Sequence, residues 1–262
     1  MRVVAIIPAR MASSRFPGKP LAPIHGIPMV GHVYFRSKMS STLQQVYLAT
    51  CDAPIQAYAE RIGAPCIMTS TTHERAVDRT VEANASVEAM TGQPSDIVVM
   101  IQGDEPMVYP EMIDEAVAPL LADDTVQLVN LAAPLKDREE HNDPNAVKVV
   151  MDQAGDAMYF SREPIPSWKK GAAELPMWKQ VCIIPFRRDF LVTFGRLPQT
   201  PLERAESVDM LRAMEHGYRV RIVPTRYDTY CVDTPEDLAR AQRKMAADPL
   251  LARYRPAAPV RP

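Results

Sequence analysis

The most constraining feature of the chain is a short apolar run at its start, Val3–Ile7, that ends abruptly at Pro8. The run is too short for a helix and rich in β-branched residues, so it predicts a buried strand. Strand-like runs recur at 46–50, 66–68, 96–101 and 126–133, a hairpin-like pair of runs lies at 146–150 and 157–162, and helix-like segments lie at 28–38, 53–62 and 236–245. Asp52 and Thr234 are the expected N-caps of the last two helices, and His32 in the first is expected to be a packed or surface residue and not a ligand. Because strands and helices alternate along the chain, we expect an α/β fold with a mainly parallel sheet.

Length, charge and cysteine content exclude several classes of protein. The 262 residues predict a single domain over 1–250 and a C-terminal tail at 251–262. A net charge of −2 gives no electrostatic reason to expect binding to nucleic acid or to a membrane. No apolar run approaches the roughly 18 to 20 residues that span a bilayer, and the four cysteines are too scattered for a C-x-x-C metal site. The first strand begins at once, without room for a signal peptide, so we expect a cytoplasmic protein with free thiols.

A loop rich in cations follows the first strand. Within ten residues it carries Arg10, Arg15 and Lys19, with Ser13, Ser14 and Gly18 between them. Ligands of open α/β sheets bind outside the carboxyl ends of the strands, so the loop should lie over the ligand crevice. Small residues let backbone N–H groups approach an anion and the cations neutralise it, which suits the triphosphate of a nucleotide. The loop matches neither the P-loop nor the dinucleotide-binding pattern, and its spacing alone fits an ordinary basic surface loop equally well.

The residues of this loop also carry a family resemblance. Pro8-Ala9-Arg10, Ser13-Ser14-Arg15 and Pro17–Leu21 resemble the signature loop of the sugar nucleotidyltransferases, and among these the CMP-Kdo synthetases (3-deoxy-manno-octulosonate cytidylyltransferases). The resemblance implies a three-layer, Rossmann-like nucleotidyltransferase fold with a smaller extra sheet, at about 142–197, for acceptor cover and for a homodimer. It implies that the nucleotide is bound by Ala9, Arg10, Ser13, Ser14, Arg15, Lys19, Thr50, Ser70 and Arg79, with Arg10 and Lys19 also catalytic.

The segment 69–79 resembles the loop that holds the cytosine in this family. Thr69, Ser70, His73, Asp78 and Arg79 match the family pattern, whereas Arg75, Ala76 and Val77 replace its Ser, Gly and Thr. The lost Gly removes the freest backbone position, and the lost Thr removes a hydroxyl that could contact the base.

A carboxylate at the end of the strand 96–101 is a candidate metal ligand. The strand runs into Gln102-Gly103-Asp104-Glu105-Pro106. Mg²⁺ prefers one or two carboxylates together with phosphate oxygens and water, although a turn Asp bonded to its own backbone would give the same pattern. The five residues match a family motif throughout, and Val232–Leu238 match a second one. The resemblance therefore implies that Asp104, also catalytic, and Asp233 hold Mg²⁺, with Asp233 at the end of a strand over 230–233.

The implied acceptor site contains the largest departures from the family. Gln102 and Arg162 match, and Arg162 could bind an acidic acceptor through a bidentate contact. Gln180 and Ile184 replace the family's His and Tyr, and Asp209 and Met210 replace a Glu-Gln pair on a helix that begins near Glu206. A site built to hydrogen-bond hydroxyls discriminates strongly, so these changes predict an altered acceptor.

The sequence thus predicts a cytidylyltransferase that uses CTP and Mg²⁺ to activate a small acidic acceptor, with release of pyrophosphate. Kdo or a related 2-keto-3-deoxy sugar acid is the acceptor that the resemblance implies; a phosphonate or phosphate is the alternative. A glycosyltransferase that uses a finished nucleotide sugar would not need Arg15 and Lys19. A non-catalytic nucleotide sensor would not need both carboxylates, and Mg²⁺-dependent turnover would exclude it.

Overall fold

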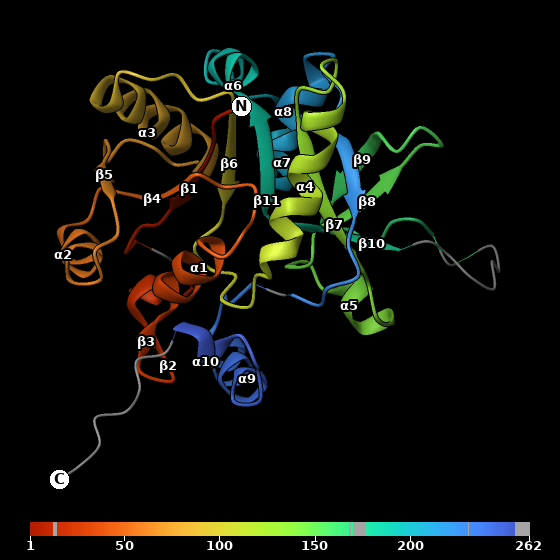
Figure 1. Cartoon of the computed structure of the whole chain (residues 1–262). Helices are drawn as coiled ribbons and strands as arrows, with labels where there is room; N and C mark the ends of the chain where they lie inside the picture. Colours follow the sequence, from red (N-terminus) through yellow and green to blue (C-terminus); the bar gives the residue numbers. More distant parts are fainter. Residues whose placement is uncertain (13–14, 168, 170–176, 230, 255–262) are drawn as a thin grey trace, which may run out of the picture.

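Two five-stranded sheets and a two-stranded ribbon form the frame of the computed structural model, which describes residues 1–12, 15–167, 169, 177–229 and 231–254 (Figure 1). The strands are β1 (Val3–Pro8), β2 (Pro23–Ile24), β3 (Ile27–Pro28), β4 (Gln45–Thr50), β5 (Cys66–Met68), β6 (Ile97–Ile101), β7 (Val129–Pro134), β8 (Lys148–Met151), β9 (Ala157–Ser161), β10 (Trp178–Val181), β11 (Ile183–Arg187) and β12 (Arg221–Pro224). The helices are η1 (Lys19–Leu21), α1 (Met29–Ser37), α2 (Ala53–Arg61), α3 (Ala76–Thr91), α4 (Pro110–Ala122), α5 (Arg138–Asn142), α6 (Arg188–Phe194), α7 (Pro201–Glu206), α8 (Met210–Glu215), α9 (Pro235–Met245) and α10 (Leu251–Tyr254).

The first sheet has the strand order β11-β6-β1-β4-β5. Three parallel pairings join β6, β1, β4 and β5, and only β11 runs antiparallel to its neighbour β6 among the described strands of this sheet. The predicted α/β class with a mainly parallel sheet is confirmed, as are the strands expected at 46–50 and 66–68.

Helices cover both faces of this sheet because its central strands are apolar on both sides. In β1 the side chains of Val3, Ala5 and Ile7 pack in one core cluster with α1, α2 and α4, whereas those of Val4 and Ile6 pack in another with α3 and α6. Successive residues of a strand point to opposite faces, so a continuous apolar run feeds two cores at once. This packing gives the three-layer arrangement.

The second sheet has the order β12-β7-β10-β8-β9 and is mainly antiparallel. It contains the expected hairpin of β8 and β9, but it also takes in β7 and β12, which lie outside the range 142–197. Conversely, β11 falls inside that range and joins the first sheet. The boundaries expected for the extra sheet are therefore wrong, because long-range pairing assigned these strands.

Three local expectations also require correction. The residues 231–233 form no strand; instead the backbone N–H of Val232 donates to the carbonyl of Asp104 at 2.9 Å, and Tyr230 lies outside the described residues. The helix expected from Glu206 is interrupted at Ser207, whose left-handed φ of 54° ends α7 before α8 begins. Asp52 stands before α2 but does not cap it, because its carboxylate accepts from the backbone N–H of Met11 at 2.8 Å.

The C-terminal segment packs further than expected. Leu251 is buried in α10, and the hydroxyl of Tyr254 lies 2.8 Å from Nδ1 of His32 and accepts from Nε of Arg36 at 3.0 Å. His32 is thus a packed residue of α1, as expected, and the tail predicted from 251 is wrong for Leu251–Tyr254. Within the described residues, no helix has the length and apolarity that a membrane span requires.

Candidate active site

A cavity of about 500 Å³ opens at the carboxyl ends of β1 and β6, between the first and second sheets. It brings together most of the residues that the sequence singled out. Those that line it are Ala9, Arg10, Arg15, Lys19, Arg79, Gln102, Asp104, Arg162, Gln180, Ile184, Asp209 and Asp233.

Three predicted site residues do not line the cavity. Thr50 is fully buried, and its hydroxyl accepts from the backbone N–H of Asp52 at 3.1 Å. The hydroxyl of Ser70 is bonded to that of Thr72 at 2.8 Å, and Met210 packs in the core with no exposed surface. Ser13 and Ser14 lie outside the described residues.

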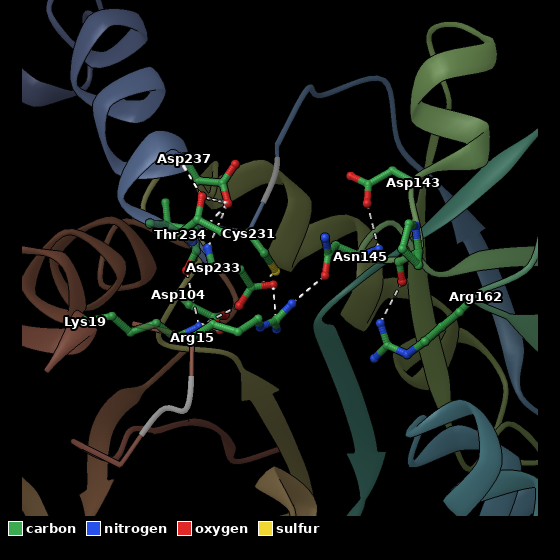
Figure 2. A network of polar contacts seen from close by, with 12 residues as sticks. Arg15, Lys19, Asp104, Asp143, Asn145, Arg162, Cys231, Asp233, Thr234 and Asp237 are labelled. Atoms are coloured by element: carbon green, nitrogen blue, oxygen red, sulfur yellow. Dashed lines mark hydrogen bonds and ion pairs between the residues drawn. The ribbon is translucent and has the colours of Figure 1, made fainter. Parts of the chain in front are cut away.

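The centre of the site is a lysine between two carboxylates. The ammonium nitrogen of Lys19 lies 2.7 Å from Oδ2 of Asp104 and 2.9 Å from Oδ1 of Asp233, and it also donates to the carbonyl of Val232 at 3.2 Å. Figure 2 shows this cluster facing Arg162 across the site. Segments far apart in the sequence thus place three charges at one point.

Local structure explains how the two carboxylates are held. Asp104 follows β6 after Gly103, where a Cβ would lie only 3.2 Å from the carbonyl oxygen of Pro8. Asp233 precedes a capping box in which the hydroxyl of Thr234 accepts from the N–H of Asp237 at 3.1 Å. The Asp237 carboxylate in turn accepts from the backbone N–H of Asp233 at 3.1 Å. The capping role predicted for Thr234 is confirmed, and it fixes the loop that carries Asp233.

The electrostatics of this cluster favour a cation. Burial alone would lower the pKa of Lys19, but Asp104 and Asp233 outweigh burial and raise it well above its ordinary value. Two carboxylates that already enclose a positive charge are also a donor set suited to a divalent ion whose remaining ligands are phosphate and water. Among the described residues no group of three or more His, Cys, Asp or Glu forms a closed metal site. The donor set therefore fits a metal that arrives with a nucleotide.

Two further cations line the same side of the cavity. The Arg15 guanidinium is half-exposed, lies 3.0 Å from Oδ2 of Asp233 and donates to the side-chain oxygen of Asn145. Arg10 is exposed and forms no ion pair with any residue that the structure describes. Together with Lys19 they give this wall the positive charge expected from the sequence.

On the opposite side, Arg162 is held by Glu206. The Glu206 carboxylate accepts from the backbone N–H of Arg162 at 2.7 Å and from the hydroxyl of Ser161 at 2.8 Å. Burial alone would raise the pKa of Glu206, but these hydrogen bonds outweigh it and lower the pKa. The Arg162 side chain donates from Nε to the Glu206 carbonyl at 2.6 Å and from one terminal nitrogen to the Pro144 carbonyl at 2.8 Å.

The floor between these walls is partly apolar, as the presence of Ile184 in the sequence led us to expect. Ile184 is buried and contributes an apolar surface. The amide nitrogen of Gln180 donates to the side-chain oxygen of Asn130 at 2.6 Å, which leaves its carbonyl oxygen as the group to offer a ligand. Gln102 lies beside them after β6, with its backbone N–H bonded to the carbonyl of Cys182 at 3.1 Å.

A cluster of charges around α7 and α8 lies where the sequence predicted acceptor contacts. Arg212 pairs with the buried Glu203 at 2.6 and 2.9 Å and with Asp78 at 2.9 Å. Arg75 reaches the same place from the start of α3: its Nε lies 3.8 Å from both Glu203 and Asp209. Burial raises the pKa of Asp209 to about 6.

Arg79 organises the loop that precedes α3. Its guanidinium is almost fully buried and donates to the hydroxyl of Thr69, to the carbonyl of Ser70 at 3.2 Å and to that of His73 at 3.5 Å. These bonds hold the loop backbone, so Arg79 shapes the cavity wall more than it offers donors to a ligand.

Several residues of the site had no distinct sequence signal. Asn145, Cys182 and Cys231 line the cavity, and no sequence pattern assigned them to the site; Arg75 also lines it, although the sequence marked it only as a change in the loop expected to hold the base. Glu105 was within a recognised motif, yet its role was not predicted. Its buried carboxylate accepts from the backbone N–H of Cys182 at 3.0 Å and from the Thr229 hydroxyl at 3.2 Å, and it thereby joins both cysteine-bearing segments to the end of β6.

Comparison with known proteins assigns the chain to a family of nucleotide-using enzymes. A family model described as cytidylyltransferase matches residues 4–222. The chain is 43% identical over 256 residues to a 3-deoxy-manno-octulosonate cytidylyltransferase of Geobacter metallireducens, covering 94% of this chain and 98% of the relative, and 44% identical over 249 residues to one of Syntrophobacter fumaroxidans, covering 95% and 98%. The solved structure of CMP:2-keto-3-deoxy-manno-octonic acid synthetase complexed with CTP superposes with a TM-score of 0.85 at 36% identity, covering 94% of this chain and 99% of that one. The chain therefore belongs to the cytidylyltransferase family and, within it, to the 3-deoxy-manno-octulosonate cytidylyltransferases (CMP-Kdo synthetases).

Proposed function

We propose that this protein transfers the cytidylyl group of CTP to 3-deoxy-manno-octulosonate (Kdo) and releases pyrophosphate, with Mg²⁺ as its metal. One observation carries the proposal: a single cavity holds a carboxylate pair and three cations on one side and the anchored Arg162 on the other. The relative whose structure contains CTP has the same fold, and other relatives are named for Kdo. A triphosphate and an acidic sugar require opposite walls of this kind.

The phosphates would lie against the wall formed by Arg10, Arg15 and Lys19. These cations neutralise the triphosphate and orient the α-phosphorus toward the acceptor. A hydroxyl oxygen of the acceptor then attacks that phosphorus, the bond to the β-phosphate breaks and pyrophosphate leaves. Such a reaction depends on position and charge more than on covalent help from the protein.

Asp104 and Asp233 would hold the Mg²⁺. When bound, the ion neutralises charge at the α-phosphate and makes the attacking oxygen more nucleophilic. Lys19 lies between the same two carboxylates, so its ammonium would compete with the ion for them and would be free to bind phosphate where the ion replaces it.

Pyrophosphate release tests the proposal. The purified protein is given Mg²⁺, each of the four nucleoside triphosphates, and a panel of acceptors that includes Kdo, other ulosonic acids and small phosphonates. We expect turnover with CTP and Kdo, its loss in D104N and D233N, and its retention in the exposed control D124N. Turnover with CTP and a different acid would refute Kdo as the acceptor. Absence of turnover with every pair, or equal use of all four bases, would refute the cytidylyl transfer itself.

A further inference from the structure

Among Arg75, Arg79 and Arg162, Arg75 has the fewest side-chain hydrogen bonds to described residues. Its side chain is 18% exposed and lines the cavity. One terminal nitrogen donates to the hydroxyl of Ser207 at 2.7 Å, and the other N–H groups form no hydrogen bond to any described residue. By comparison, Arg79 is almost fully buried and donates to groups of its own loop. Arg162 donates from two side-chain nitrogens to backbone carbonyls.

The two carboxylates beside Arg75 do not accept hydrogen bonds from its guanidinium. Glu203 is already paired twice with Arg212, at 2.6 and 2.9 Å. Asp209 lies 3.8 Å from Nε of Arg75, beyond hydrogen-bond distance, and its own carboxylate forms no hydrogen bond to the described residues. The guanidinium is thus held in place by charge while its donors remain available to a planar anion.

Arg75 and Arg162 converge on one turn. Arg162 is fixed by both the carboxylate and the carbonyl of Glu206, and Arg75 is bonded to the next residue, Ser207. Both side chains line the cavity, and Figure 2 shows Arg162 on the side opposite the Lys19 cluster. A planar carboxylate is a ligand that guanidiniums anchored in this way can bind through paired N–H groups.

We propose that Arg75 is a specificity-determining residue that binds the carboxylate of the acceptor, with Asp209 holding its guanidinium against the cavity wall. The proposal rests on the proposed function and names the group of the acceptor that this site recognises. It assigns a ligand-binding role to a residue at which this chain departs from its family pattern.

The test compares R75S, R75K and wild type in initial rates with CTP, Mg²⁺ and either Kdo or its uncharged methyl ester. Arg75 is the residue before α3, at a position where Ser is a favoured cap, so R75S should fold. We expect R75S to raise the KM for Kdo roughly tenfold to hundredfold, the effect of one lost charged hydrogen-bonding contact, with KM for CTP within about twofold. R75K keeps the charge without the planar fork and should fall in between. The preference for Kdo over the ester should drop by the same factor in R75S.

R219S is the matched control, because Arg219 is 86% exposed and does not line the cavity. An unchanged KM for Kdo in R75S, an unchanged preference over the ester, or a rise in the KM for CTP instead would overturn the proposal. If wild type turns over only another acid, Kdo fails as the acceptor and the same comparison is made with that acid. If wild type turns over nothing, the proposed function fails, and calorimetric titration of Kdo with CTP and EDTA present still decides: weaker binding in R75S supports the role of Arg75, and equal binding overturns it.

Discussion

Replacing Asp209 by Asn should stabilise this protein at neutral pH. Asp209 stands just before α8, its side chain is only 13% exposed, and its nearest cation is 3.8 Å away. A buried carboxylate with so distant a partner is costly to ionise. Asn fills nearly the same volume and carries no charge, so D209N removes the cost of ionisation together with the attraction between Asp209 and Arg75. The raised pKa of Asp209 already includes that attraction.

The magnitude follows from the pKa of Asp209, which burial raises from 3.8 to about 6. The unfolded chain therefore loses this proton near pH 4, while the folded protein keeps it until about pH 6. Stability falls as the pH rises through that window and is constant above it. Each pKa unit corresponds to about 1.4 kcal/mol, so the ionised form costs about 2 to 3 kcal/mol of folding free energy at pH 7.

Urea unfolding of wild type and D209N between pH 4 and pH 8 measures this cost. We expect nearly equal free energies of unfolding at pH 4, a difference that opens between pH 4 and pH 6, and a plateau above pH 6 with D209N the more stable. The control is D124N, because the Asp124 side chain is 93% exposed. If the difference in free energy of unfolding between D209N and wild type does not change with pH, or if D209N is the less stable at pH 7, burial does not raise the pKa of Asp209 in the folded protein.

Two further predictions concern the wall that carries Lys19, Asp104 and Asp233. K19M should lower stability by about 1 to 3 kcal/mol without metal, because Asp104 then loses its cation and Asp233 keeps only the half-exposed Arg15. Added Mg²⁺ should raise the Tm of K19M more than that of wild type, and equal shifts in thermal melts would contradict a metal site at this pair. G103A should reduce pyrophosphate release roughly tenfold or more with little change in Tm, because a Cβ 3.2 Å from the Pro8 carbonyl displaces the end of β6; wild-type rates would contradict that tight approach.

The sheet core and the placement of the Lys19, Asp104 and Asp233 cluster could be predicted from the sequence because their determinants are mostly local. A β-branched apolar run such as Val3–Ile7 can hardly be anything but a buried strand, and a Gly-Asp pair directly after another such run lies at the same edge of a parallel sheet. Asp233 reached the same place although its segment forms no strand. The capping box after it, and one backbone hydrogen bond to Asp104, position it instead.

The acceptor half resisted prediction because long-range contacts decide it. A single left-handed residue, Ser207, breaks the expected helix, so Asp209 lines the cavity while the next residue, Met210, enters the core. No local pattern announces that break, since Ser is neither required nor typical in this conformation. In the same way β7 and β12 joined the second sheet through pairings that periodicity cannot reveal.

The departures from the family pattern acquire meaning only in three dimensions. In the sequence, Arg75 belongs to the loop expected to hold the base, and Asp209 belongs to the expected acceptor site, so their changes count as two separate losses. In the structure Nε of Arg75 lies 3.8 Å from the Asp209 carboxylate, and Arg75 also donates to the hydroxyl of Ser207, two residues before Asp209. Arg in place of Ser extends the side chain, while Asp in place of Glu shortens the opposing one by a methylene group. The two changes together exchange one set of donors for another on the same wall of the cavity, so if the proposed role of Arg75 holds, they form one coupled change and not two independent losses.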